Sequence, residues 1–314
     1  MKMSMERHSL LNIFKVVRQF IVWPLIVGAM FYPNVSNAID SVVIVSITEN
    51  GAHQRFSNAF QKKLILSHPD IEIFENSADD FTLPETDSLL VTLGSRALNE
   101  TVDEKSGVKL HTLISNTLYQ KYYPKHDGAV YNLVFDHPLE RILRLQSIAL
   151  PESRNIGVMV GSQSSEFVDK LTREIKKTGR QLVTEPVVEG KFSRSLSNLL
   201  ADSDSLLLFP DAKVINRTTI NTLVLDSYHK KIPLIGYSKA LVKAGALLGL
   251  YSTPEQLGED AAEIASRIIT GKKVAFHNYP NQFEISVNYK LSRVYGLSLP
   301  SEKELHDKLL KGER

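Results

Sequence analysis

Short apolar runs alternate along this chain with longer segments in which apolar residues recur every three or four positions. The runs SVVIVSI (41–47), DSLLVTLG (87–94) and NIGVMVG (155–161) are typical of strands buried on both faces. After the first run, Phe56, Phe60 and Leu64 lie four residues apart, which predicts a helix with one buried face. Strands of this kind separated by amphipathic helices predict parallel sheets covered by helices on both faces.

The same alternation continues to residue 251. Further strands are expected at 71–75, 108–115, 128–135, 181–188, 205–210, 232–237 and 246–251. Helices are expected between them, among them one from Ser95, one near 193–201, one near 216–230 and one from Ser238. The stretch 302–314, EKELHDKLLKGER, reads as a solvated helix.

The series starts afresh near Asp136, which can cap a helix that has Pro138 in its first turn. About ten strands could form a (β/α)8 barrel, but this restart favours two open sheets. The letters DSLL open two of the expected strands, at Asp87 and at Asp204, and are weak evidence of repeated architecture.

One helix is marked clearly at its start and at its end. Thr253 is a natural N-cap, Pro254 stands at the first helical position, and Gln256 completes a capping box. Gly271 follows the last apolar position and ends the helix. The sequence therefore predicts a helix over 254–270.

The first 38 residues have the pattern of a secretory signal peptide. Four basic residues precede the apolar run 20–32, and Ser36 and Ala38 supply the small residues of a cleavage site after Ala38. An uncleaved membrane anchor is the alternative, although Pro24 interrupts the run and the run is short for a membrane span. We expect export to a bacterial periplasm.

Composition then excludes several classes of function. The chain has 314 residues with a formal net charge of +2, so neither a nucleic-acid surface nor an acidic field is indicated. Cysteine is absent, which excludes disulfides and thiolate chemistry. The nine histidines show no metal-ligand spacing, and no nucleophile elbow or P-loop is present, so we expect no enzyme, no metal and no cofactor.

The second half of the chain resembles a known family. The stretches YSKALVKAGALLGLYSTPEQLGEDAAEIASRIITGKK (237–273) and VNYKLSRVYGLSLP (287–300) resemble periplasmic substrate-binding proteins of ABC transporters, in the subgroup with tryptophan- and tyrosine-type binders. The stretch HPLERILRLQSIALPESRNIGVMVG (137–161) is similar to the same family. The match is looser before residue 130.

The resemblance implies a type I periplasmic binding protein, an α/β fold of two Rossmann-like lobes with parallel sheets joined by a three-stranded hinge. Lobe one would comprise 39–135 plus 252–314, with the helix at 254–270 packed on it, and lobe two would comprise 136–251. The two DSLL strands would then occupy corresponding positions facing one interlobe cleft.

Ligands of open parallel sheets bind beyond the carboxyl ends of the strands, where helix N-termini also offer N–H groups to anions. Each candidate could instead be a helix cap or a solvated loop residue. The residues expected at those ends are Thr48, Glu49, Asn50, Gly94, Ser95 and Asn116 from lobe one, Ser162, Ser164, Asp211, Tyr237 and Ser238 from lobe two, and Tyr251 at a crossing.

The expected function is binding of a small organic solute by hinge closure, for delivery to an inner-membrane ABC permease. An amino acid is one option for the ligand, and another solute or an anion is left open. The alternative function is a ligand-sensing module that signals to a membrane sensor kinase, and a third is a structural partner whose cleft has lost its ligand. We expect a monomer that binds no nucleic acid.

Overall fold

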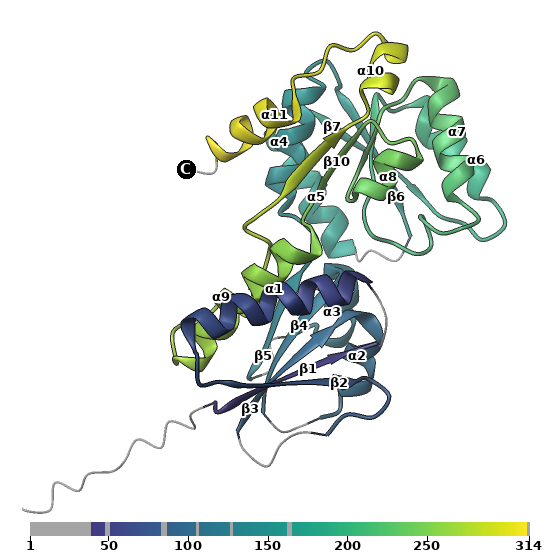
Figure 1. The fold of residues 1–314 in the computed structure, drawn as a ribbon. Helices are drawn as coiled ribbons and strands as arrows, with labels where there is room; N and C mark the ends of the chain where they lie inside the picture. The colour runs from purple at the N-terminus through teal and green to yellow at the C-terminus, as the bar shows by residue number, and fades with distance from the viewer. Residues whose placement is uncertain are drawn as a thin grey trace, which may run out of the picture. The chain divides into compact units, whose positions relative to one another are not determined.

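The computed structural model describes residues 39–47, 51–82, 87–104, 107–125, 128–161 and 165–312. The expected signal peptide, its cleavage site and the alternative membrane anchor therefore lie outside the described residues. Within the described part, the strands form two six-stranded sheets (Figure 1). This arrangement confirms the prediction of two open sheets over a (β/α)8 barrel.

Sheet one is parallel throughout and has the strand order β11-β5-β4-β3-β1-β2. Its strands are β1 (Ser41–Ser46), β2 (Glu72–Ser77), β3 (Ser88–Leu93), β4 (Val108–Ile114), β5 (Val130–Val134) and β11 (His277–Asn278). Its helices are α1 (Gly51–Ser67), α2 (Gly94–Thr101), α3 (Asn116–Tyr122) and α9 (Pro254–Ile269).

Alternate residues of β1 face opposite layers of helices, as the geometry of a strand requires. Val42 and Ile44 pack in one cluster with Phe56 of α1 and Ala261 of α9. Val43 and Val45 pack on the other side with Ala97 of α2. Sheet one is thus buried between two helical layers, which explains why its central strands are apolar almost throughout.

Sheet two has the order β12-β10-β9-β8-β6-β7, and only its edge strand β12 is antiparallel to its neighbour. Its strands are β6 (Asn155–Val160), β7 (Gln181–Pro186), β8 (Ser205–Leu207), β9 (Leu234–Gly236), β10 (Leu248–Tyr251) and β12 (Glu284–Val287). Its helices are α4 (Leu139–Ala149), α5 (Ser165–Lys177), α6 (Phe192–Ala201), α7 (Ile220–Lys230), α8 (Lys239–Ala244), α10 (Tyr289–Tyr295) and α11 (Glu302–Leu310).

The expectation that the last helix is solvated is wrong. In α11, Leu305 and Leu309 are fully buried in the same cluster as Leu143 of α4 and Ile285 of β12. The four-residue spacing of the two leucines places them on one helix face. The many charged residues around them made the segment look fully solvated when it was judged by composition alone.

The chain passes between the two sheets three times, after β5, after β10 and between β11 and β12. Helix α9 packs on sheet one, as expected from the resemblance, and its Thr253–Gln256 capping box is present. The expectation that all of 252–314 belongs to lobe one differs from the structure, because β12 pairs with β10 and α11 packs against α4. The lobe boundaries themselves stay a proposal.

The two DSLL segments open β3 and β8, and each of these strands is fourth in the strand order of its sheet. Each lies beside the strand that opens its half of the fold, β1 in sheet one and β6 in sheet two. The expectation that the repeated letters mark corresponding positions is confirmed.

Gly258 of α9 permits the closest approach between α9 and α1. A Cβ at this position would lie 2.5 Å from the backbone oxygen of Phe56. We expect Gly258→Val to lower the free energy of unfolding by roughly 1–3 kcal/mol, because the two helices must move apart. Chemical denaturation measures the change. Lys62→Val, which places the same side chain at an exposed position of α1, is the control, and equal losses in both variants would refute this contact.

Candidate ligand-binding site

The carboxyl ends of β3 and β4 carry three of the predicted site residues of sheet one. Gly94 begins α2 and is buried with a φ of 85°, a conformation that favours glycine, and Ser95 follows it on the exposed side. Asn116 begins α3. Thr48, Glu49 and Asn50 lie outside the described residues.

His53 lies beside Gly94, and no sequence pattern had singled it out. A Cβ at Gly94 would come within 3.3 Å of the ring nitrogen Nε2 of His53. Burial lowers the pKa of His53, so its ring is kept neutral more readily than a solvated one. The absence of a side chain at Gly94 therefore leaves room for an imidazole at the end of β1 and β3.

Asn116 and Asp136 meet where β5 leaves sheet one. The carboxylate Oδ2 of Asp136 accepts a hydrogen bond of 2.6 Å from the backbone N–H of Asn116. The side-chain oxygen Oδ1 of Asn116 is buried and has no hydrogen-bond partner among the described residues. Asp136 does not cap α4 as expected, because that helix begins at Leu139 with Pro138 as its N-cap and has no side-chain cap.

At the carboxyl ends of β6 and β8, Asp211 packs against the backbone of Gly161. A Cβ at Gly161 would lie 2.7 Å from the carboxylate oxygen Oδ2 of Asp211, so only glycine fits beside this carboxylate. Asp211 is buried, and its Oδ1 accepts a hydrogen bond from the backbone N–H of Lys213. Ser162 and Ser164 lie outside the described residues.

Tyr237 follows β9, and its ring stacks on that of Phe135 with a centroid separation of 6.5 Å. Burial, and then the negative charges of Asp136 and Asp211, raise the pKa of Tyr237 to about 12. The structure therefore groups two predicted residues, Tyr237 and Asp211, with Asp136. Ser238 is the N-cap of α8, and its hydroxyl accepts a hydrogen bond from the backbone N–H of Leu241. This is the helix-capping role that the sequence offered as the alternative to ligand binding.

Tyr251 ends β10, and its hydroxyl lies 2.9 Å from that of Ser286 in β12. The following crossing residues are held together by Arg141 of α4, which donates to the carbonyl of Pro280 at 2.8 Å and lies 3.1 Å from Nδ1 of His137. The guanidinium also lies over the ring of Phe283. Arg141 thus links the start of lobe two to the crossing between β11 and β12.

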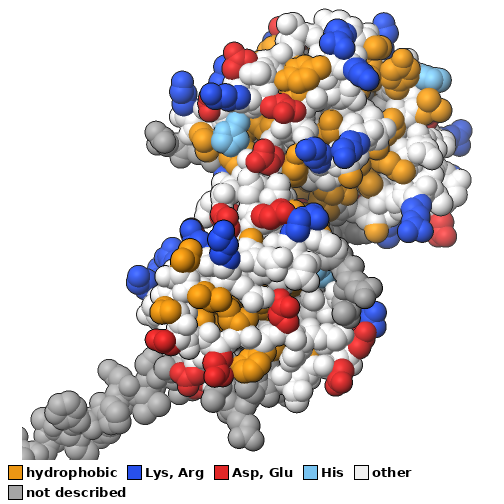
Figure 2. All heavy atoms as spheres, in the orientation of Figure 1, with side chains coloured by type: hydrophobic (Ala, Val, Ile, Leu, Met, Phe, Trp, Pro, Cys, Tyr) orange, Lys and Arg blue, Asp and Glu red, His pale blue; other side chains and the backbone are white. Residues whose placement is uncertain are grey.

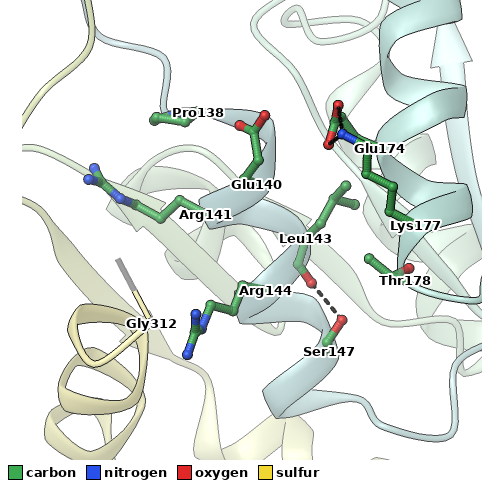
Figure 3. Close-up of a pocket in the computed structure, with 10 residues that line it drawn as sticks. All are labelled: Pro138, Glu140, Arg141, Leu143, Arg144, Ser147, Glu174, Lys177, Thr178 and Gly312. Atoms are coloured by element: carbon green, nitrogen blue, oxygen red, sulfur yellow. Dashed lines mark hydrogen bonds and ion pairs between the residues drawn. The ribbon is translucent and has the colours of Figure 1, made fainter. Parts of the chain in front are cut away.

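A pocket of about 610 Å³ lies elsewhere, on the helices that cover one face of sheet two. Figure 3 shows its lining side chains, with Arg144 directed toward Gly312 and with Glu174 and Lys177 on α5. Both signs of charge line it, and it does not lie at the carboxyl ends of the strands. Nothing in its lining selects a ligand class, so the strand ends stay the expected ligand site.

A metal site and a membrane span each set requirements for the described side chains. In the described part of the chain, no group of three or more histidine and acidic side chains is placed to hold a metal ion. No helix there has the length and apolar character needed to span a bilayer. On the face that Figure 2 shows, basic and acidic side chains are interspersed.

Comparison with known families gives one match that covers half of the chain. The family model described as ABC transporter substrate binding protein matches residues 134–295. A curated tyrosine-binding protein from Clostridioides difficile (strain R20291) is 26% identical over 140 residues, which is 43% of this chain. The match spans only 40% of that relative's length.

Solved structures match over most of the chain. A substrate-binding protein with adhesive properties from Clostridium difficile, in a ligand-free, open form, superposes with a TM-score of 0.64 and 20% identity, covering 84% of this chain and 97% of that one. An ABC domain from Streptococcus pneumonia in complex with L-Trp superposes with a TM-score of 0.59 and 15% identity, covering 86% and 98%. At these identities the likeness establishes the shared fold and confirms the expected fold class.

Proposed function

The chain belongs to the family of ABC transporter substrate-binding proteins, and on that premise we propose that it binds a small organic solute between its lobes and delivers it to an inner-membrane permease. Members of this family bind small ligands and are not enzymes, so the prediction of a binding protein is confirmed. The finer parts of the proposal are the periplasmic location, closure about the hinge and an amino acid as the first ligand to test.

The stack of Phe135 on Tyr237 carries this proposal. Phe135 leaves sheet one and Tyr237 ends a strand of sheet two, so the contact brings together the strand ends at which open sheets bind ligands. Hinge closure around a ligand needs a few crossing residues that absorb the motion, and the three crossings provide them.

The amino-acid option rests on relatives. The curated relative is described as tyrosine-binding, and the pneumococcal structure holds L-Trp. Their low identity to this chain leaves the ligand open, so the screen must also include sugars, organic acids and amines.

Ligand binding is tested with the full chain, expressed with its own N-terminal segment in a Gram-negative host. We expect native mass spectrometry to detect a co-purified small molecule, and a thermal-shift screen to identify one that stabilises the protein. A ligand at one hundred times its dissociation constant adds about 2.7 kcal/mol to the free energy of unfolding. The intact mass of the recovered protein tests cleavage after Ala38 in the same sample. A protein that carries and binds nothing in both assays would contradict the proposed function.

Transport and signalling use the same ligand site, so binding data do not separate them. Uptake of the identified ligand by the source bacterium does separate them. Loss of uptake on deletion of the gene is expected for a transport component. Unchanged uptake with an altered transcriptional response would indicate the sensor kinase alternative.

A further inference from the structure

The carboxylate of Asp136 has no cationic partner among the described residues. Its carboxylate accepts a hydrogen bond of 2.6 Å from the backbone N–H of Asn116, and no described lysine, arginine or histidine lies within ion-pair distance. Asp136 is partly buried. A carboxylate removed from water is costly unless a positive charge or several hydrogen bonds accompany it.

The aromatic side chains around Asp136 do not supply that charge. Burial, and then the carboxylates of Asp136 and Glu140, raise the pKa of Tyr279 to about 12. Burial, and then the carboxylates of Asp136 and Asp211, likewise raise the pKa of Tyr237. The charges that raise the pKa of these two phenols are those of Asp136, Asp211 and Glu140, and a cation placed beside Asp136 would be attracted by them.

The same place offers a second hydrogen-bond acceptor, on the side chain of Asn116. The side-chain oxygen of Asn116 is buried without a partner among the described residues, and Asn116 is also the residue whose backbone N–H holds Asp136. Two acceptors, one of them charged, are thus available at the start of α3. Acceptors of this kind fit a group that donates several hydrogen bonds and carries a positive charge, which an ammonium group does.

Aromatic faces complete the site. The rings of Phe135 and Tyr237 stack with 24° between their planes, next to the carboxylate. Such rings bind the apolar part of an organic ligand and also attract a cation held near their faces.

We propose that Asp136, with the side-chain oxygen of Asn116, receives the protonated nitrogen of the ligand, while Phe135 and Tyr237 contact its apolar part. The ligand class is therefore a small organic amine, either a zwitterion or a simple cation, rather than a neutral sugar or an organic acid. This inference rests on the proposed function and specifies the ligand for the same site.

Matched probes that differ in one group test the proposal. Each set holds an amino acid, its amine without the carboxylate, and its acid without the amine: L-tyrosine, tyramine and 3-(4-hydroxyphenyl)propionate; L-tryptophan, tryptamine and indole-3-propionate; L-leucine, isoamylamine and 4-methylpentanoate. D-ribose and D-glucose represent neutral solutes. Calorimetric titration of the full chain is expected to give binding by amine-bearing members of at least one set and none by the amine-free members or the sugars.

The variant Asp136→Asn tests the residue itself. We expect at least a tenfold loss of affinity for the amine probe that binds, because the new side chain is neutral. The new amide oxygen can still accept from the N–H of Asn116, and circular dichroism checks that the fold is retained. Asp204→Asn is the matched control, since the Asp204 carboxylate also accepts backbone N–H groups, those of Arg154 and Asn155, but at the amino ends of the strands.

The outcomes separate this inference from the proposed function. Binding of a sugar or of an amine-free acid, with equal affinity in Asp136→Asn, would overturn the inference and leave the solute-binding function standing. An equal loss of affinity in both variants would also overturn it, because the effect would then be structural. Absence of any bound molecule in the broad screen would overturn the proposed function and the inference together.

Discussion

Lowering the pH from 7 to 4 is expected to remove about 3 kcal/mol of stability through His111 alone. The His111 ring is fully buried in β4, with Nδ1 2.7 Å from the hydroxyl of Thr92 and Nε2 3.2 Å from that of Tyr123. Burial, and then the positive charge of Lys109, lower the pKa of His111 to about 3. The folded protein therefore resists the proton that the unfolded chain accepts near pH 6.5.

The direction of the effect follows from this difference in proton binding. The stability that the neutral ring contributes is fully present above pH 6.5 and is lost progressively as the pH falls toward 3. His137, in the first crossing, behaves in the same way, because burial and Arg141 lower its pKa to about 3. The two rings together account for roughly 6 kcal/mol at pH 4, which is comparable with the whole stability of an ordinary domain.

Urea denaturation at a series of pH values measures this dependence. His111→Asn is expected to be less stable than the natural chain at pH 7, since it loses a buried ring, but its stability will depend less steeply on pH between 6.5 and 4. His229→Asn, which alters an exposed ring on α7, is the control and should keep the natural slope. A natural slope in His111→Asn as well would show that this histidine does not govern acid unfolding.

Asp136→Asn is expected to stabilise the ligand-free protein by about 3 kcal/mol at pH 7.5. Burial raises the pKa of Asp136 to about 6, in spite of the N–H of Asn116, which acts in the opposite direction. The folded protein therefore favours the protonated carboxyl. The stability that the protonated carboxyl contributes is fully present below about pH 3.8 and is lost as the pH rises through about 6. At pH 7.5 the natural chain therefore bears the whole free-energy cost of the ionised carboxylate.

The gain from Asp136→Asn should depend on pH, which distinguishes it from improved packing. At pH 4 the difference from the natural chain should be near zero. Glu140 of α4, Tyr237 after β9, Tyr279 after β11 and Asn116 of α3 surround the carboxyl and are unchanged in the variant. An equal gain in the free energy of unfolding at both pH values, or a loss at pH 7.5, would contradict the inference that Asp136 is an ionised carboxylate without a cationic partner. Asp204→Asn again serves as the control and should show no gain at either pH.

Both predictions bear on how far the sequence alone could reach. The apolar runs and their spacing predicted the central strands and most helices, because burial between two helical layers leaves a direct pattern in the residues. The capping residues of α9 predicted its first residue and came within one residue of its last, Ile269. Strand β12 was missed, since its four residues stand at a sheet edge and pair antiparallel to β10.

The site was harder to predict for a physical reason. Asp136 precedes a proline and a helix, which is the pattern of a cap, and only the packing of α3 against β5 reveals that its carboxylate turns to Asn116. His53 lies within a helix whose apolar spacing does not include it. Both residues depend on contacts between segments that are distant in sequence, and no local pattern encodes such contacts.

The position of α9 and β11 late in the sequence has a consequence for the order in which sheet one can fold during synthesis. Both elements complete sheet one, yet they are synthesised only after every strand of sheet two except β12. An emerging chain therefore cannot seal the apolar face formed by Val42, Ile44 and Phe56 until most of it has left the ribosome. Until α9 has been synthesised, the first half of the chain leaves this apolar surface open to water, so sheet one is completed only after strands β6 to β10 exist.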